Sequence, residues 1–195
     1  PVPDLAGITA ISAGPKHVCA IRDDYTVFCW GFNRSGQLGD GTRTDSATPV
    51  QVAGLEDVLE IALGSEHTCG RVRGGSVYCW GHCGYGELGN GSFTASWIPQ
   101  PEKVLNLDDA VEISAAGFRS CARRGSGQVV CWGNNEYGGL GDGTLLSRAE
   151  PSAVLGLMDA TGLAGAHCAL RADETVACWG SGVVGQLGDG SWDIV

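Results

Sequence analysis

One spacing of cysteines occurs four times along the chain. In each copy a cysteine is followed ten residues later by a second cysteine, which opens the triplet Cys-Trp-Gly. Successive triplets begin 50, 52 and 47 residues apart, and a fixed period of this size is typical of stacked supersecondary units. The sequence therefore predicts a repeat protein whose function lies on its loops. The pairs are Cys19 with Cys29, Cys69 with Cys79, Cys121 with Cys131, and Cys168 with Cys178.

Each unit contains strand-sized apolar segments separated by glycine-rich turns, without a helical period. This pattern predicts an all-β fold. Four short antiparallel strands in about 50 residues match the size of a β-propeller blade. A right-handed β-helix is the competing architecture, but its repeats are usually shorter and need no tight hairpin. We expect one repeat domain over residues 1–195, with repeats at approximately 1–48, 49–98, 99–150 and 151–195.

The cysteine spacing predicts a hairpin within each unit. The midpoint of each pair is a turn residue, and an odd-membered loop there places the two cysteines opposite each other on adjacent strands. Opposed Cα atoms lie roughly 4.5–5.5 Å apart, which a disulfide can span. Reduced core cysteines and zinc ligands are the alternatives, although zinc ligands are usually more closely spaced. The midpoints are Asp24, Gly74, Ser126 and Asp173.

Disulfides indicate an oxidising compartment, so we expect an extracellular, cell-surface or periplasmic protein. Cys83 has no partner in the pattern and replaces a turn residue, since Asn33, Asn135 and Gly182 stand at this place in the other units. It is predicted to be a free thiol. The alternative is that Cys83 links two chains.

Charge and chain composition restrict the partners. The formal net charge is −10, which disfavours nucleic acid and anionic lipid. No apolar run reaches the roughly 18–20 residues of a membrane span, so we expect no membrane insertion. The chain starts at Pro1 without an initiator methionine, which we interpret as a segment of a longer precursor.

The segment Trp30–Thr42, which reads Trp-Gly-Phe-Asn-Arg-Ser-Gly-Gln-Leu-Gly-Asp-Gly-Thr, resembles the repeat of the regulator of chromosome condensation family. The match recurs at Trp80–Ser92, Trp132–Thr144 and Trp179–Ser191. The resemblance implies a β-propeller, most often of seven blades, of which four repeats are present here. An excerpt of a larger propeller is the favoured interpretation, and such an excerpt could self-associate. The alternative is a ring closed by pairing of Val2 with the last blade.

Functions within this family diverge. They include nucleotide exchange on a small nuclear GTPase, ultraviolet-B reception in plants and secreted inhibition of β-lactamases. The paired cysteines look like those of bacterial secreted and surface members. The extra tryptophans of the photoreceptors are missing, because this chain has Pro15–His17, Ser65–His67 and Phe118–Ser120 at their place.

Residues that could carry catalysis do not form a pattern. The four histidines, His17, His67, His82 and His167, do not share one register, so a catalytic triad is not predicted. Asp40, Asn90, Asp142 and Asp189 lie in glycine-rich loops that offer one acid at most, which favours turns over calcium sites. We expect no enzyme activity, no metal and no cofactor. The recurrent tryptophans are expected to pack between blades.

Aromatic side chains that do not recur are the candidates for partner contacts, because rigid rings in loops commonly anchor interfaces. The predicted function is a non-enzymatic scaffold that binds a protein or a surface glycan through its loops. Nucleotide exchange on a small GTPase and inhibition of a secreted enzyme are the alternatives. The candidate residues are Phe32, Arg34, Tyr85, Phe93, Trp97, Phe118, Tyr137 and Trp192.

Overall fold

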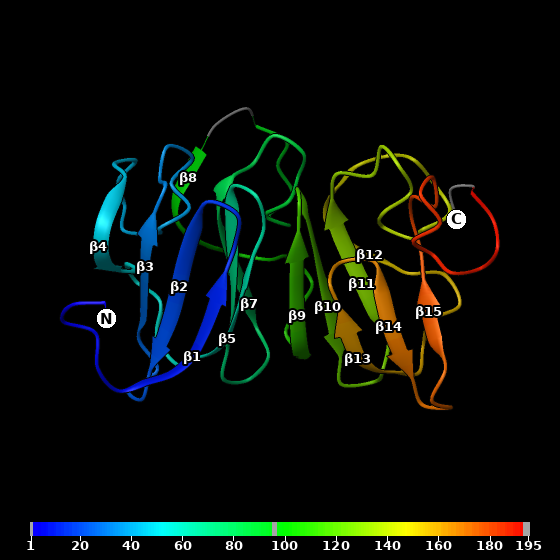
Figure 1. Ribbon diagram of the computed structural model, residues 1–195, viewed down its shortest axis with the longest axis horizontal. Helices are drawn as coiled ribbons and strands as arrows, with labels where there is room; N and C mark the ends of the chain where they lie inside the picture. The colour runs from blue at the N-terminus through cyan, green and yellow to red at the C-terminus, as the bar shows by residue number, and fades with distance from the viewer. Residues whose placement is uncertain (1, 95–96, 193–195) are drawn as a thin grey trace.

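The computed structural model describes residues 2–94 and 97–192 and confirms the all-β fold (Figure 1). Three antiparallel sheets have four strands each, and the fourth has three among the described residues. No helix of this part of the chain is long and apolar enough to cross a membrane. In chain order the strands are β1 (Ile8–Ala13), β2 (His17–Arg22), β3 (Val27–Gly31), β4 (Ser46–Gln51), β5 (Val58–Leu63), β6 (His67–Val72), β7 (Val77–His82), β8 (Trp97–Lys103), β9 (Ala110–Ala116), β10 (Arg119–Arg124), β11 (Val129–Gly133), β12 (Arg148–Ala153), β13 (Ala160–Ala164), β14 (Cys168–Arg171) and β15 (Val176–Cys178).

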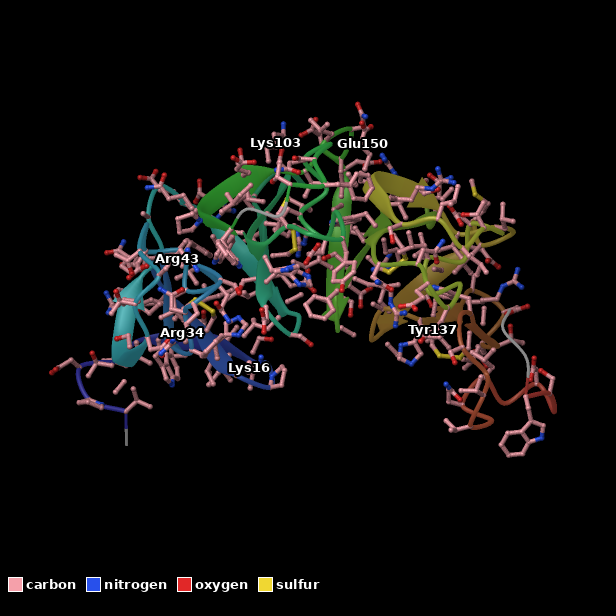
Figure 2. The ribbon with its side chains drawn as sticks, turned by 90° about the horizontal axis from the view of Figure 1, so that it is seen from above. Lys16, Arg34, Arg43, Lys103, Tyr137 and Glu150 are labelled. Atoms are coloured by element: carbon pink, nitrogen blue, oxygen red, sulfur yellow. A yellow bond between two sulfur atoms is a disulfide. The ribbon has the colours of Figure 1, made fainter. Side chains whose placement is uncertain are left out.

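The sheets stand side by side as the blades of a propeller. Each sheet keeps its strands in chain order, and neighbouring sheets meet through their first strands, β1 with β5, β5 with β9 and β9 with β13. These strands therefore lie where the blades converge. Figure 2 shows the blades as an open arc, with Lys103 and Glu150 on its convex side and Lys16 and Tyr137 toward its concave side.

The first and fourth blades lie at opposite ends of the arc (Figure 1). Val2 belongs to no strand and does not pair with the fourth blade, so the expected alternative of a ring closed through Val2 is wrong. The blades are also offset from the sequence repeats. The stretch 49–52 opens the second sequence repeat, but most of it lies in β4, which pairs with β3 of the first blade.

The register of the hairpins brings each predicted cysteine pair together. The two cysteines of a pair stand directly opposite each other on the second and third strands of their blade. All four pairs are disulfides with a Cα–Cα distance of 4.1 Å, so the disulfide prediction is confirmed. Each bridge closes a short loop, which stabilises the fold by about 2–3 kcal/mol. The bridges join Cys19 with Cys29, Cys69 with Cys79, Cys121 with Cys131, and Cys168 with Cys178.

The separation of the bridged Cα atoms differs slightly from the expected one. The observed 4.1 Å at Cys69 and Cys79, and equally at Cys121 and Cys131, is shorter than the roughly 4.5–5.5 Å of opposed strand positions. The covalent bridge draws the two strands together at this point. The same short distance in all four blades shows that the hairpins share one local geometry.

Because the strands alternate in direction, the connections fall on two faces. One face, called here the loop face, carries the turns between first and second strands and the long segments that follow third strands. The opposite face carries the hairpin turns at 23–26, 73–76, 125–128 and 172–175. The described segments of the loop face are 14–16, 32–45, 64–66, 83–94, 117–118, 134–147, 165–167 and 179–192.

Candidate partner-binding face

Recurrent tryptophans join each blade to the loop of the blade before it. The indole Nε1 of Trp80 donates to the main-chain oxygen of Gln37 at 2.9 Å. Trp132 donates to Glu87 O at 2.9 Å, and Trp179 donates to Gly139 O at 3.1 Å. These bonds, made by indoles that are almost fully buried, confirm the predicted packing between blades. Trp30 of the first blade is only partly buried.

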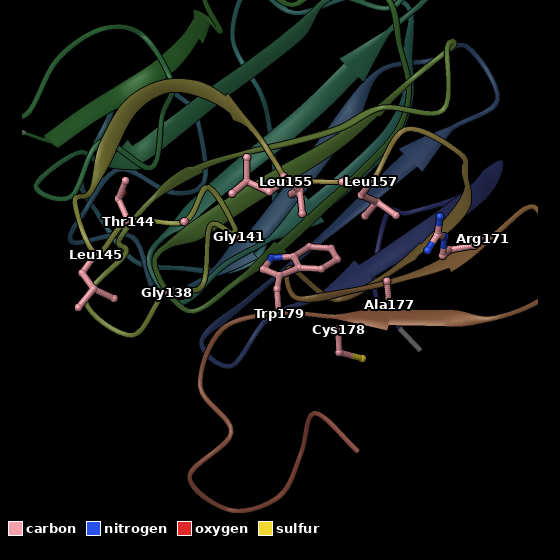
Figure 3. Close-up of a pocket in the computed structure, with 13 residues that line it drawn as sticks. Gly138, Gly141, Thr144, Leu145, Leu155, Leu157, Arg171, Ala177, Cys178 and Trp179 are labelled. Carbon is pink, nitrogen blue, oxygen red and sulfur yellow. The ribbon is translucent and has the colours of Figure 1, made fainter. Parts of the chain in front are cut away.

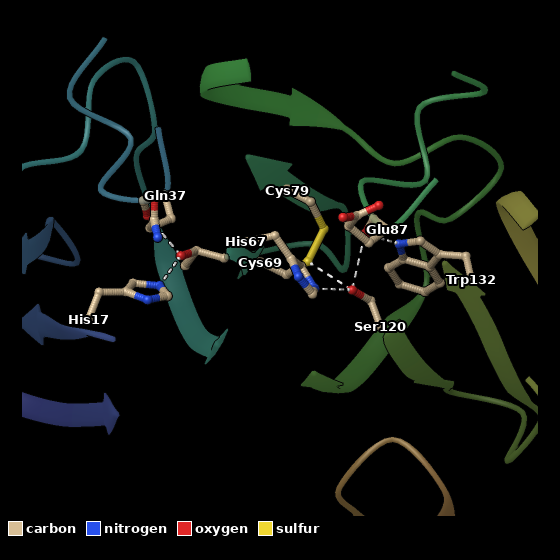
Figure 4. Close-up of a disulfide and its surroundings, with 9 residues drawn as sticks. His17, Gln37, His67, Cys69, Cys79, Glu87, Ser120 and Trp132 are labelled. Carbon is tan, nitrogen blue, oxygen red and sulfur yellow. Dashed lines mark hydrogen bonds between the residues drawn. A yellow bond between two sulfur atoms is a disulfide. The ribbon is translucent and has the colours of Figure 1, made fainter. Parts of the chain in front are cut away.

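Histidines add a second link at the first two interfaces (Figure 4). The Thr68 hydroxyl donates to Gln37 O at 2.9 Å, so its oxygen accepts from His17 Nε2 at 2.7 Å. Likewise, the Ser120 hydroxyl donates to Glu87 O at 3.1 Å, and its oxygen accepts from His67 Nε2 at 2.9 Å. Each of these histidines therefore bonds to the neighbouring blade.

Burial keeps these two histidines neutral. It lowers the pKa of His17 to about 4, with a further contribution from His67. Burial likewise lowers the pKa of His67 to about 4, although the Glu87 carboxylate acts in the opposite direction. In both rings Nδ1 is buried without a hydrogen-bond partner, so a second proton would find no acceptor there.

The third interface is built differently. Arg119 stands at the position of His17 and His67, and His167 stands at the position of Thr68 and Ser120. A Cβ added at Gly139 would lie 2.0 Å from Nη1 of Arg119. The guanidinium thus fills the space above a glycine, where the first two blades have the side chains of a glutamine and a glutamate.

Asparagine side chains organise the long loops of the first and third blades. Asn33 Nδ2 donates to Asp40 Oδ1 at 3.2 Å and to Thr44 O at 3.1 Å, and its Oδ1 accepts from the amide of Leu38 at 2.9 Å. Asn135 makes the equivalent bonds in the third blade. The Asp40 carboxylate also accepts from the amide of Thr42 at 2.9 Å. The predicted turns at Asp40, Asn90, Asp142 and Asp189 all show this last bond.

Cys83 occupies the asparagine position of the second loop. Its thiol is buried and donates weakly to Ser92 O at 3.6 Å, and burial raises its pKa. It is unpaired in the described chain. Because the side chain has no exposed surface, the alternative of a bridge to a second chain is not supported.

An aromatic cluster on the loop face joins the second and third blades. It contains His82, Tyr85 and Phe118, and we use the name aromatic cluster for these three residues. Ring centroids are separated by 5.1 Å between Tyr85 and Phe118 and by 5.4 Å between His82 and Phe118. The Tyr85 side chain is 41% exposed. Two of the predicted partner-binding residues therefore lie together, with a histidine that the sequence analysis did not select.

The buried carboxylate of Glu87 holds this cluster in place. Its Oε1 accepts a short hydrogen bond from His82 Nδ1, and its Oε2 accepts from the amide of Tyr85 at 2.8 Å. The bond to Glu87 raises the pKa of His82 against the effect of burial. Glu87 has no exposed surface, so it positions the His82 ring and the main chain of Tyr85 without itself being available to a partner.

The other candidates are spread along the arc. Lys16 lies 5.1 Å from the ring centroid of Phe32. Trp97 is the first residue of β8 rather than a loop residue, and Arg43 stacks on it at 3.8 Å. Arg34 forms an exposed ion pair with Asp45 at 3.8 Å. Phe93, Tyr137 and Trp192 are 54%, 51% and 69% exposed.

A pocket of about 600 Å³ lies beside Trp179 at the outer edge of the fourth blade (Figure 3). Leu155 and Leu157 form one wall, and Ala177 and Trp179 of the fourth blade form another. In the first three blades this edge is covered by a fourth strand. No group of three histidine, cysteine or acidic residues in the described ranges is arranged to hold a metal ion.

Two models of the regulator of chromosome condensation (RCC1) repeat match the chain. One matches residues 25–70 and 74–122, and the other matches residues 8–37, 58–87 and 110–138. Together the matches extend from the first blade into the long loop of the third. The chain belongs to the RCC1 repeat family. The predicted family resemblance and the predicted propeller fold are confirmed.

Relatives of known name show how widely this repeat is used. The ultraviolet-B receptor UVR8 of Arabidopsis thaliana is 31% identical over 149 residues, which are 75% of this chain and 34% of the receptor. Yeast RCC1 (Prp20), solved with Kap60 bound, superposes with a TM-score of 0.86 at 20% identity, over 99% of this chain and 48% of that one. The ectodomain of the Physcomitrella patens receptor kinase CR4 has a TM-score of 0.60 at 26% identity, over 92% and 43%. The chain therefore spans a third to a half of these proteins.

Proposed function

We propose that this chain is a non-enzymatic binding module that engages a protein partner through the loop face. The aromatic cluster is the observation that carries this proposal. Tyr85 is exposed, and its main chain is held by the buried Glu87 carboxylate, so its ring can bury apolar area against a partner with little loss of conformational entropy.

The relatives support a protein partner. Yeast RCC1 has been solved with Kap60 bound, and a second structure of that protein is described together with its binding to Gsp1p and histones. UVR8 is named as a receptor. A surface glycan is the other ligand class that exposed aromatic rings can bind, and it becomes an outcome of the test below.

We also propose an extracellular or cell-surface location. Four disulfides fit an oxidising compartment, and the CR4 match is itself an ectodomain. Nucleotide exchange on a small GTPase, the family's namesake activity, is less well supported because it operates in a reducing environment. The protein is unfolded without a reductant, alkylated and measured by mass spectrometry, and we expect one alkylated cysteine, the buried Cys83. Nine alkylated cysteines would contradict the location.

Enrichment from the culture medium of the source organism tests the binding face. Immobilised wild-type chain is compared with Tyr85→Ala, and Tyr25→Ala serves as the matched control because Tyr25 is 40% exposed on the opposite face. We expect quantitative mass spectrometry to find a protein that the wild type and Tyr25→Ala retain and Tyr85→Ala loses. Loss only with Tyr25→Ala, or enrichment of glycans without protein, would contradict the proposal.

A further inference from the structure

Arg119 is a cation without a partner in the part of the chain that the structure describes. No hydrogen bond or ion pair is made by its side chain there, and its Nε is buried without an acceptor. Burial lowers the pKa of the guanidinium, although arginine remains charged at neutral pH. A partly buried charge with no counter-ion is costly for a fold, which makes Arg119 a candidate for contact with a ligand.

The surroundings of Arg119 lack the acid that the second blade provides. There, Glu87 lies close to His67, the residue equivalent to Arg119. In the third blade Gly139 replaces the glutamate. The residue facing Arg119 from the fourth blade is His167, whose pKa is lowered by burial and then by the charge of Arg119. This histidine stays neutral and does not compensate the guanidinium.

The guanidinium and the aromatic cluster flank the third blade. Phe118 precedes Arg119 in the chain and contacts Tyr85 of the second blade, while Nη1 lies over Gly139 in a loop of the loop face. The exposed Tyr137 belongs to the same loop as Gly139. The loop face thus carries apolar rings on one side of the third blade and a cation on its other side, a distance that an extended peptide crossing this blade can span.

We infer that Arg119 and the aromatic cluster together form a docking site for an acidic peptide segment of the protein partner. The segment places a carboxylate on the guanidinium and an apolar side chain on the cluster. This inference rests on the proposed function and names the chemistry of its partner. A carboxylate matches the two parallel donors of arginine, and partial burial strengthens the attraction relative to an exposed pair. A long polyanion such as nucleic acid is disfavoured by the net charge of −10.

Peptides selected on the intact chain from a random library displayed on phage provide the probe. We expect the selected peptides to carry an aspartate or glutamate near an aromatic or aliphatic residue. A fluorescein-labelled peptide from this selection should bind Arg119→Gln about 10- to 100-fold more weakly than wild type. Arg119→Lys, which keeps the charge without the planar donors, should give an intermediate loss.

Two controls make the result decisive. Arg73→Gln removes the same charge from the opposite face, where Arg73 is exposed and pairs with Asp57, and it should bind normally. Arg119→His, which introduces the residue of the first two blades, should keep the fold by circular dichroism and still lose the peptide. Selected peptides without acidic residues, or equal weakening by Arg73→Gln, would overturn the inference. If Tyr85→Ala weakens binding and Arg119→Gln does not, the binding face stands and the acidic peptide is wrong.

Discussion

The interface between the second and third blades and the interface between the third and fourth use the same frame with different side chains. Both are joined by an indole that donates to a main-chain oxygen, Trp132 to Glu87 O and Trp179 to Gly139 O. In the earlier interface His67 bonds to Ser120. In the later one a charged side chain takes the place of the histidine, and a buried Nε is left without an acceptor.

This difference separates the contacts that join the blades from the side chains that are free to vary and to bind a partner. The indole bonds are kept at every interface, so they carry the assembly of the blades. The histidine position varies. Where it changes to Arg119, the glutamate of the same blade's long loop changes to Gly139, which provides the space. A departure from the repeat that is sterically accommodated but electrostatically unsatisfied indicates a role outside folding.

Removal of an indole should have the largest effect on this comparison. Trp132→Ala deletes a side chain with no exposed surface and should lower the free energy of unfolding by about 3–5 kcal/mol. Trp30→Ala, at the partly buried start of the arc, should cost less than about 2 kcal/mol because less apolar area is lost. Urea unfolding followed by tryptophan fluorescence and far-ultraviolet circular dichroism measures both. Equal losses would mean that the joints do not carry the assembly.

Acidification should weaken the first two interfaces next. His17 and His67 have pKa values of about 4 in the fold and about 6.5 unfolded. The unfolded chain therefore takes up protons first, and stability falls by about 1.4 kcal/mol per pH unit for each histidine as the pH drops from about 6.5 to about 4. His82 has a raised pKa and contributes in the opposite sense, since its stabilisation is lost as the pH rises.

Substitution of one buried histidine tests the assignment. His67→Gln keeps a donor toward Ser120 and does not titrate, so the slope of unfolding free energy against pH should decrease by about 1.4 kcal/mol per unit in that window. His82→Gln serves as the control and should not reduce this acid-side slope. An unchanged slope for His67→Gln would contradict the neutral, buried state of His67.

Side chains like those of the second blade, introduced at positions 139 and 119 of the third blade, should change the free energy of unfolding least. Gly139→Gln alone meets the Arg119 guanidinium and should cost about 1 kcal/mol or more through overpacking. Combined with Arg119→His, the same change should cost less than the sum of the two single changes, because the clash is gone. A double-mutant cycle by chemical denaturation measures this coupling, and additive costs would show that the two positions do not share space.

Local sequence spacing was sufficient for the features that each repeat makes within itself. The cysteine register follows from a hairpin with an odd-membered turn, and the turns at Asp40 and its equivalents follow from a short side chain that accepts from an amide two residues later. The recurrent Trp80 and Trp132 were predicted to pack between blades because they share one register. These features depend on a few neighbouring residues, so a single sequence reveals them.

Features that combine two repeats could not be predicted in this way. Tyr85 and Phe118 were candidates separately, but their contact depends on the turn of one blade meeting the loop of the preceding one. The role of His82 does not follow from recurrence, because only one repeat has a histidine at this position. The sequence does contain one indication of this site: of the four residues at the repeat position of Glu87, only Glu87 is acidic. Trp97 begins β8 although most of the candidate aromatics lie in loops, because the blades are offset from the sequence repeats.

The acceptor in every indole joint is a main-chain carbonyl, and every amino acid provides one. Gln37, Glu87 and Gly139 differ in size and charge, yet each receives the same bond. Mutations at this position can therefore accumulate while the blades stay joined. A repeat protein of this kind can acquire new ligand specificity through single substitutions, and each intermediate sequence still folds.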